Sequence, residues 1–242
     1  MKRRDFLKRL IEITLASSNL GVYSESIQQP KIKSEDLLAT GIKNIYLTID
    51  DGPGKYMGEI LEKINKRKGK VVFYIVGEHY NANKTGQTLV KKAIEYGHII
   101  ANHSYSHPNF NSISLDSAKI QIQKTDEIIE KAYSEVGIKR EVKLFRFPGG
   151  SAKKSVIPFL ETLRYRPIRS WDSKKEDDWN IDTLDWKYGN GIDGEKIMNI
   201  CRKTKEGDVV LVHDQPRGNY FTANRIIPYY LNEKEYKLIL PA

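Results

Sequence analysis

The stretch NIYLTIDDGP, residues 44–53, decides how the rest of the chain is interpreted. Its β-branched and aromatic side chains predict a strand that ends in two adjacent carboxylates, Asp50 and Asp51. Because Asp, Gly and Pro are turn-forming residues, one interpretation of the end of this stretch is a polar turn. Two neighbouring like charges cost free energy unless a cation or hydrogen-bond donor lies near them. The residues at the other strand ends show whether such a partner exists.

The rest of the chain alternates short apolar runs with helix-like patterns. We expect further strands over residues 70–77, 98–104, 143–150, 208–214 and 236–242. Helices are expected over residues 55–66, 85–97, 114–137, 195–205 and 222–232. Buried strands that alternate with helices predict a parallel sheet in an α/β domain, either a barrel or an open sheet. In both architectures, reactive residues gather at the C-terminal ends of the strands.

Polar side chains fall at these predicted strand ends. Besides the two aspartates, they are His103, His107, Arg146, Asp182, Asp185, Trp186, His213 and Asp214. Two imidazoles and a carboxylate suit zinc or a similar divalent ion and leave positions open for water and substrate. His98 begins a strand, so we expect it to lie at the end of the sheet opposite the reactive residues and to have a structural role. His79 follows the second strand, but nothing in the sequence pairs with it.

The composition restricts the kinds of site and partner that the protein can have. The chain has 242 residues, a net charge of +9 and one cysteine, Cys201. One cysteine excludes an intrachain disulfide and a cysteine-based zinc site. The positive charge favours an acidic partner such as an anionic wall polymer, although a lysine-rich soluble surface explains it equally well. Because no nucleic-acid-binding motif is found, we expect no nucleic-acid partner.

The N-terminal segment resembles an export signal. Basic residues precede an apolar segment in MKRRDFLKRLIEITLASS, residues 1–18, and RRDFLK within it resembles a twin-arginine signal. An amphipathic helix is the alternative interpretation. We therefore expect an export-signal-like segment and linker over residues 1–40, a folded domain over residues 41–242, and an exported protein. No run of about 20 apolar residues is present, so we expect no ordinary transmembrane helix.

Five ordered motifs match a known family. They are TIDDGP (48–53), HSYSHP (103–108), RFPGG (146–150), DTLDW (182–186) and LVH (211–213). Over about residues 44–240 the chain resembles the NodB-type polysaccharide deacetylases, carbohydrate esterase family 4. The resemblance implies a distorted (β/α) barrel with about seven parallel strands, and a catalytic domain over residues 41–242. It also implies metal-dependent removal of acetyl groups from N-acetylated sugars.

The resemblance also implies residue roles. The metal ligands would be Asp51, His103 and His107; the general base Asp50, paired with Arg146; the general acid His213, tuned by Asp185; and the substrate-binding residues Trp186, Leu211, Pro148 and Gly149. Zinc is the expected ion, with cobalt or nickel as alternatives. The family often has an aromatic residue where Gly149 stands, and glycine here would open the groove and alter sugar stacking.

Several of these residues have a simpler interpretation. Arg146 could be a surface residue, Trp186 a core residue and Asp214 a turn residue. Asp182 competes with Asp185 for contact with His213. The polar stretch SWDSKKEDDW, residues 170–179, resembles an insertion near the rim that contacts substrate.

The expected substrate is an N-acetylglucosamine polymer. Peptidoglycan comes first, followed by chitin-like oligomers and a biofilm glucosamine polymer. One alternative is an esterase that removes O-acetyl groups from a xylan-like polymer. The other alternative is a carbohydrate-binding protein without activity, although the base, the acid and all three metal ligands are present. A monomer is favoured.

Overall fold

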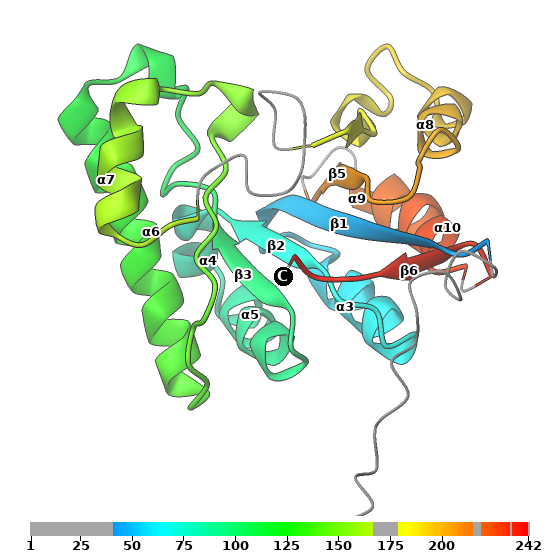
Figure 1. Ribbon diagram of the computed structural model, residues 1–242, viewed down its shortest axis with the longest axis horizontal. Coiled ribbons are helices and arrows are strands. Elements are labelled where there is room, and N and C mark those ends of the chain that lie inside the picture. The colour runs from blue at the N-terminus through cyan, green and yellow to red at the C-terminus, as the bar shows by residue number, and fades with distance from the viewer. Residues whose placement is uncertain (1–40, 167–178, 215–218, 233, 242) are drawn as a thin grey trace, which may run out of the picture. The chain divides into compact units, whose positions relative to one another are not determined.

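The computed structural model describes residues 41–166, 179–214, 219–232 and 234–241 (Figure 1). The chain divides into two units, Met1–Ala39 and Thr40–Ala242, and the description below concerns the second. The expected export segment and most of the polar stretch at 170–179 lie outside the described residues. Among the residues that are described, no helix is long and apolar enough to cross a membrane.

All strand pairings of the sheet are parallel. The strands are β1 (Lys43–Gly52), β2 (Val72–Ile75), β3 (Ile99–Asn102), β4 (Ile181–Asp182), β5 (Val209–His213) and β6 (Tyr236–Leu238). Their order is β3-β2-β1-β5-β4, and β6 pairs with the beginning of β1. The predicted α/β class with a parallel sheet is confirmed, and barrel closure stays a prediction.

The prediction of a strand over residues 143–150 is wrong. Only Phe145 pairs there, through an isolated parallel bridge to Asn102. A short 3-10 turn, Pro148–Gly150, follows directly. Pro148 has no N–H for a ladder, and Gly149 and Gly150 have φ values of 56° and 68°, which belong to the left-handed region. The Pro-Gly-Gly sequence therefore ends the extended backbone that the apolar residues before it predict.

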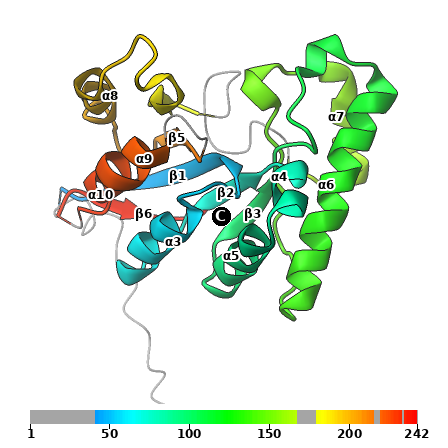
Figure 2. The same ribbon diagram turned by 180° about the vertical axis from the view of Figure 1, so that it is seen from behind.

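Helices cover the sheet and connect its strands (Figure 2). They are α3 (Met57–Lys66), α4 (Gly77–Ala82), α5 (Lys84–Glu95), α6 (Leu115–Glu135), α7 (Ile157–Thr162), α8 (Gly194–Cys201), α9 (Asn219–Phe221) and α10 (Ile227–Tyr230). The long α6 begins where predicted, because the Ser114 hydroxyl caps it by accepting the N–H of Ser117. The helix expected over residues 222–232 is interrupted by a π-helical segment, Thr222–Ile226.

The pleat of the strands sorts the side chains onto two faces. One face packs against α3, α5 and α8 and forms the main core, with Ile45, Leu47, Ile49, Phe73, Ile75, Ile100, Val210 and Val212 from the strands. The opposite face carries a smaller apolar cluster that includes Val72, Tyr74, Ala101 and Val209. In the β1–β5 register, Thr48 pairs with Leu211 and Asp50 pairs with His213. Alternate residues of a strand share a face, so these four side chains project from one face of the sheet.

Candidate active site and metal centre

The end of β1 places two adjacent carboxylates in one site. Asp50 is the last regular ladder position, and the register with β2 shifts between Asp50 and Gly52. Asp51, within this shift, has a φ of 69°. Neighbouring side chains of a regular strand point to opposite faces, and this irregularity brings the Asp51 carboxylate back toward the site. The change of direction expected at Gly52-Pro53 therefore begins one residue earlier.

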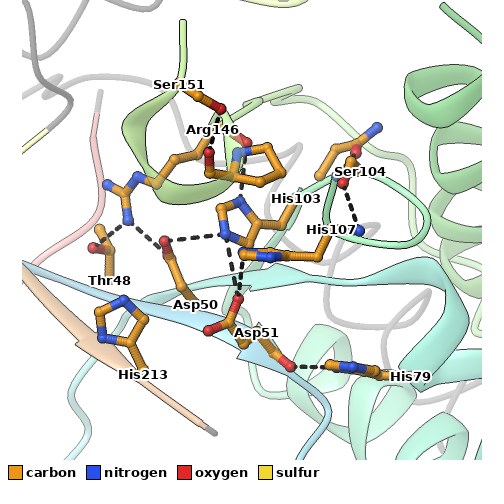
Figure 3. Close-up of polar contacts among 12 residues, drawn as sticks. Thr48, Asp50, Asp51, His79, His103, Ser104, His107, Arg146, Ser151 and His213 are labelled. Atoms are coloured by element: carbon orange, nitrogen blue, oxygen red, sulfur yellow. Dashed lines mark hydrogen bonds and ion pairs between the residues drawn. The ribbon is translucent and has the colours of Figure 1, made fainter. Parts of the chain in front are cut away.

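Three predicted metal ligands lie together (Figure 3). The ligand atoms of Asp51, His103 and His107 are all within 4.8 Å of one another. Asp51 Oδ1 is 3.4 Å from His103 Nε2 and 3.2 Å from His107 Nε2. The His103 ring donates its Nδ1–H to the carbonyl of Arg146 over 2.9 Å, which directs Nε2 toward Asp51. One carboxylate and two imidazole nitrogens therefore converge on a point that fits a divalent cation.

The loop from His103 to His107 is folded by side-chain hydrogen bonds. Asn102 Oδ1 accepts the N–H of Ser104 over 2.8 Å, and Ser104 Oγ accepts the N–H of His107 over 3.2 Å. Ser104 and His107 both have positive φ values, 69° and 55°. Gln121 Oε1 on α6 accepts the N–H groups of Tyr105 and Ser106. This folded loop brings both imidazoles to the same carboxylate.

The electrostatics of this cluster favour a cation. Burial raises the pKa of Asp51, but hydrogen bonds from His103 and His107 outweigh burial and hold it far below its usual range. Burial lowers the pKa of His103, but the Asp50 and Asp51 carboxylates raise it above its ordinary value. The two buried carboxylates that favour a positive charge on His103 would also attract a divalent ion. The donor set and its charge thus fit a metal centre.

Arg146 is buried against Asp50. Its Nη1 donates to Asp50 Oδ1 over 2.7 Å and to Thr48 Oγ1 over 2.8 Å. The guanidinium lies over the ring of Tyr74, 4.2 Å from the centroid, and 5.5 Å from the ring centroid of Trp179. Only 1% of Arg146 is exposed, so the surface interpretation is wrong. The cation offsets the charge of Asp50, which stands beside a second carboxylate.

His213 forms a second acid–base pair with Asp185. Its Nδ1–H donates to Asp185 Oδ1 over 2.7 Å, and its backbone N–H donates to Oδ2 over 2.8 Å. Asp185 also accepts the hydroxyl of Thr222 and the backbone N–H of Trp186. Burial lowers the pKa of His213, but the Asp185 carboxylate outweighs it and raises this pKa to about 9. A protonated imidazole is therefore held at neutral pH with Nε2 left for the site.

The competition between Asp182 and Asp185 is decided by these contacts. Asp182 Oδ1 accepts the backbone N–H of Leu184 over 2.9 Å, which closes the turn after β4. Asp185 is fully buried and contacts the ring of His213. The residue that orients His213 is thus Asp185, as the motif comparison implies.

The four predicted substrate-binding residues have different environments. Leu211 is buried and shares the face of Asp50 and His213, whereas Trp186 is 40% exposed, which contradicts the core interpretation. Pro148 is buried, and Gly149 is exposed with no heavy atom within 4 Å of the position of a Cβ. The structure thus leaves open space where the family often has an aromatic side chain.

Three further residues border the site through contacts that the sequence does not reveal. The ring of Trp179 lies over Arg146 and is 3.2 Å from the Cβ position of Gly150. His79 Nδ1 is 2.7 Å from the carbonyl oxygen of Asp51. Asp214 Oδ2 accepts the N–H of Gly54 over 2.6 Å, and burial raises the pKa of Asp214 to about 7. The sequence places Asp214 and His79 after strands and Trp179 in the polar stretch before β4, but it does not reveal their partners.

His98 is structural, as expected. It is buried at the start of β3, and its Nδ1 accepts the N–H of Val71 over 3.2 Å. Burial lowers the pKa of His98 to about 3, so the ring is neutral. A neutral imidazole with an acceptor role satisfies this backbone donor and takes no part in the site.

Comparison with known proteins places the chain in a family. The family model described as polysaccharide deacetylase matches residues 38–168, just over half of the chain. A peptidoglycan-N-acetylglucosamine deacetylase of Bacillus cereus is 30% identical over 198 residues, covering 77% of this chain and 67% of that protein. A chitooligosaccharide deacetylase of Rhizobium leguminosarum bv. trifolii is 28% identical over 173 residues, covering 71% and 72%.

A similar solved structure is a pseudoenzyme. This CE4 family pseudoenzyme from Bacillus anthracis is 27% identical, with a TM-score of 0.63 over 81% of this chain and 63% of that one. A mutant of it with restored enzymatic activity is 29% identical. The family match, the relatives and the shared fold agree with the five motifs. The chain therefore belongs to the polysaccharide deacetylase family of hydrolases, carbohydrate esterase family 4.

Proposed function

We propose that the protein is a metal-dependent hydrolase that removes N-acetyl groups from N-acetylglucosamine units of a cell-wall or matrix polysaccharide. One observation carries the proposal: the Asp51–His103–His107 cluster lies beside Asp50, which shares one face of the sheet with His213. A metal centre, a base and an acid in one site are what amide hydrolysis needs.

The metal would be held by Asp51, His103 and His107. When bound, a divalent cation supplies a Lewis acid that polarises the acetyl carbonyl and acidifies water. Zinc is the ion that we propose, with cobalt or nickel as alternatives, because the donors are one carboxylate and two imidazoles.

Asp50 would act as the general base. It accepts the proton of the attacking water, whose oxygen forms a bond to the acetyl carbon. Arg146 holds the Asp50 carboxylate in place, and Thr48 and the ring of Tyr74 hold Arg146. The base is therefore fixed before substrate arrives, which lowers the reorganisation that catalysis requires.

His213 would act as the general acid. It donates a proton to the leaving nitrogen while the carbon–nitrogen bond breaks, which yields acetate and a free amine. Asp185 fixes the ring orientation by accepting Nδ1–H, so the proton that moves is the one on Nε2. The raised pKa of His213, about 9, keeps this proton in place at neutral pH.

The acetyl methyl group would lie against Leu211 and Trp186. Leu211 lies on the face of the sheet that carries Asp50 and His213. Trp186 is the residue after Asp185 in the chain. Pro148 and Gly149 would border the sugar, where the absence of a side chain at Gly149 leaves room.

Peptidoglycan is the substrate that we propose first. The names of the relatives support an N-acetylglucosamine polymer, and the net charge of +9 favours an anionic one. Chitin-like oligomers and a biofilm glucosamine polymer follow, and O-acetylated xylan is the alternative in the same chemistry. Export by the N-terminal segment would bring the enzyme to a wall polymer.

A second candidate is a carbohydrate-binding protein without activity. It is favoured by the similar fold of a pseudoenzyme from the same family. The presence of the metal ligands, Asp50 and His213 in one site argues against it here.

A panel of acetylated substrates tests these proposals. Acetate release should be measured on peptidoglycan, N-acetylglucosamine oligomers and acetylated xylan, with and without chelator. We expect release from the N-acetyl substrates and its loss in chelator. Faster cleavage of acetylated xylan would favour the esterase. Binding of an oligomer without acetate release would favour the inactive binder.

A further inference from the structure

His79 contacts the backbone of a metal ligand. It follows β2 and lies in the short α4, and its ring reaches the carbonyl oxygen of Asp51 at 2.7 Å from Nδ1 (Figure 3). A carbonyl oxygen only accepts hydrogen bonds, so Nδ1 carries the proton and donates it. This contact does not involve the ligand atoms themselves.

The backbone of Asp51 lies outside the regular ladder. The carbonyls on either side of it are bound by backbone groups: Asp50 accepts the N–H of Asp214, and Gly52 accepts the N–H of Val76, both over 2.8 Å. The Asp51 carbonyl between them is bound by a side chain, that of His79. A positive φ is less favourable than a negative one for a residue with a Cβ, so the contacts around Asp51 help to hold this conformation.

The segment that carries His79 also holds the other ligand loop. The N–H of Gly77 donates to the carbonyl of Ser104 over 3.1 Å, and the N–H of Glu78 donates to that of Tyr105 over 2.8 Å. A Cβ at Gly77 would lie 2.6 Å from Thr125 Oγ1, so the approach requires glycine. Residues 77–79 thus bind the segment between the two histidine ligands and, through His79, the segment that carries Asp51.

We propose that His79 is a positioning residue for the metal centre, which fixes the Asp51 backbone relative to the two imidazole ligands. The inference rests on the metal role of Asp51 in the proposed function. Second-layer hydrogen bonds of this kind typically change metal affinity by roughly 10–100-fold when removed.

A rival interpretation is that His79 contacts substrate. Its ring is exposed and also lines an open pocket of about 540 Å³ with Lys55, Tyr56, Asp214 and Tyr220. A substrate contact would change KM and leave the affinity for metal unchanged. The two interpretations therefore predict different measurements.

The test compares His79→Ala with His79→Asn in the full chain. An Asn side chain can place an amide N–H close to the position of Nδ1, whereas Ala removes the donor. Zinc affinity is measured by competition with a chromophoric chelator, and kcat and KM are measured at saturating zinc. We expect His79→Ala to weaken zinc binding by about 10-fold or more and His79→Asn to recover most of it. Urea denaturation of the zinc-free proteins shows whether each variant is folded.

The control is Asn81→Ala, on the same helix and exposed. It should bind zinc as the unaltered protein does. If His79→Ala does not fold, His79→Gln replaces it, because its longer side chain places the amide away from the Nδ1 position. Unchanged zinc affinity in the folded variant that lacks the donor, Ala or its replacement Gln, with or without a raised KM, would overturn the proposal. If the unaltered protein bound no zinc, the metal assignment itself would fall, independently of any comparison between variants.

Discussion

Asp50 and Asp51 are neighbours in the sequence, and each carboxylate has a partner of its own. Asp50 contacts Arg146, Asp51 contacts His107, and His103 Nε2 lies 3.5 Å from Asp50 and 3.4 Å from Asp51. The register shift after Asp50 and the positive φ of Asp51 explain how both reach one site. The turn interpretation and the active-site interpretation of this stretch are therefore compatible, because the turn is what brings both carboxylates together.

The separate roles of the two aspartates can be tested with Asp50→Asn. Asn still accepts a hydrogen bond from Arg146 but cannot take a proton from water. We expect bound zinc, measured by atomic absorption, to stay unchanged, and kcat to fall by roughly 10²–10⁴-fold. Asp51→Asn is the matched variant and should lose zinc. Loss of zinc in the Asp50 variant instead would mean that the two roles are exchanged.

The pair of His213 and Asp185 gives a pH prediction. Asp185→Asn removes the charge that raises the pKa of His213 to about 9, while burial continues to lower it. A general acid is active while protonated, so the alkaline limb of the kcat–pH profile should move to lower pH. Asp182→Asn is the control, because Asp182 bonds Leu184 and not the imidazole. An alkaline limb that stays in place would contradict the role of Asp185.

The same pair affects stability. The folded pKa of His213 lies above its ordinary value of 6.5, so the pair stabilises the fold fully below about pH 6.5. This contribution is lost as the pH rises through about 9. The difference in unfolding free energy between the unaltered protein and Asp185→Asn should therefore shrink over this range. Urea denaturation at several pH values measures it.

Among the elements, α6 holds the loop of the two histidine ligands. Gln121 accepts two backbone N–H groups of this loop and donates to Ser106 Oγ over 2.9 Å. Gln121→Ala removes the acceptor of these two donors and should lower the free energy of unfolding by roughly 1 kcal/mol. Gln123→Ala, on the same helix with Glu127 as its partner, should change it by less than about 0.5 kcal/mol. Equal effects of the two changes would contradict this role of α6.

The elements differ in how well the sequence predicts them. The continuous apolar runs of β2 and β5 and the capped α6 have local signals and were found. The short α4 and α7 were missed, because helices of six residues have too few turns for a periodic pattern. The C-terminal helix was predicted as one piece, although Pro228 lacks the N–H of a regular helix and a π-helical segment precedes it.

The candidate site shows a similar division. The sequence identifies the proposed metal ligands, base and acid, because parallel strands end at one edge and each end carries a polar side chain. The family resemblance implies the contact of Asp185 with His213, but how His79 and Trp179 join the site depends on contacts between distant segments. A single sequence gives the position of such a residue but not its partner.

For the molecule as a whole, the net charge of +9 gives a prediction about substrates. Salt screens the attraction between a positive protein and an anionic polymer, with a Debye length of about 8 Å at physiological ionic strength. Added salt should therefore raise KM for peptidoglycan and leave KM for neutral N-acetylglucosamine oligomers nearly unchanged. Acetate release between low and high salt measures both. An equal response of the two substrates would contradict a role of the charge in substrate choice.

A zinc titration of metal-free protein tests whether the Asp51–His103–His107 cluster supports hydrolysis. Bound zinc and acetate release from N-acetylglucosamine oligomers and peptidoglycan are followed in the same samples. We predict no release without zinc and a linear rise that ends at one zinc per chain, the capacity of the Asp51–His103–His107 cluster. Full release from metal-free protein, or no release from any of these substrates with one zinc bound, would contradict the account.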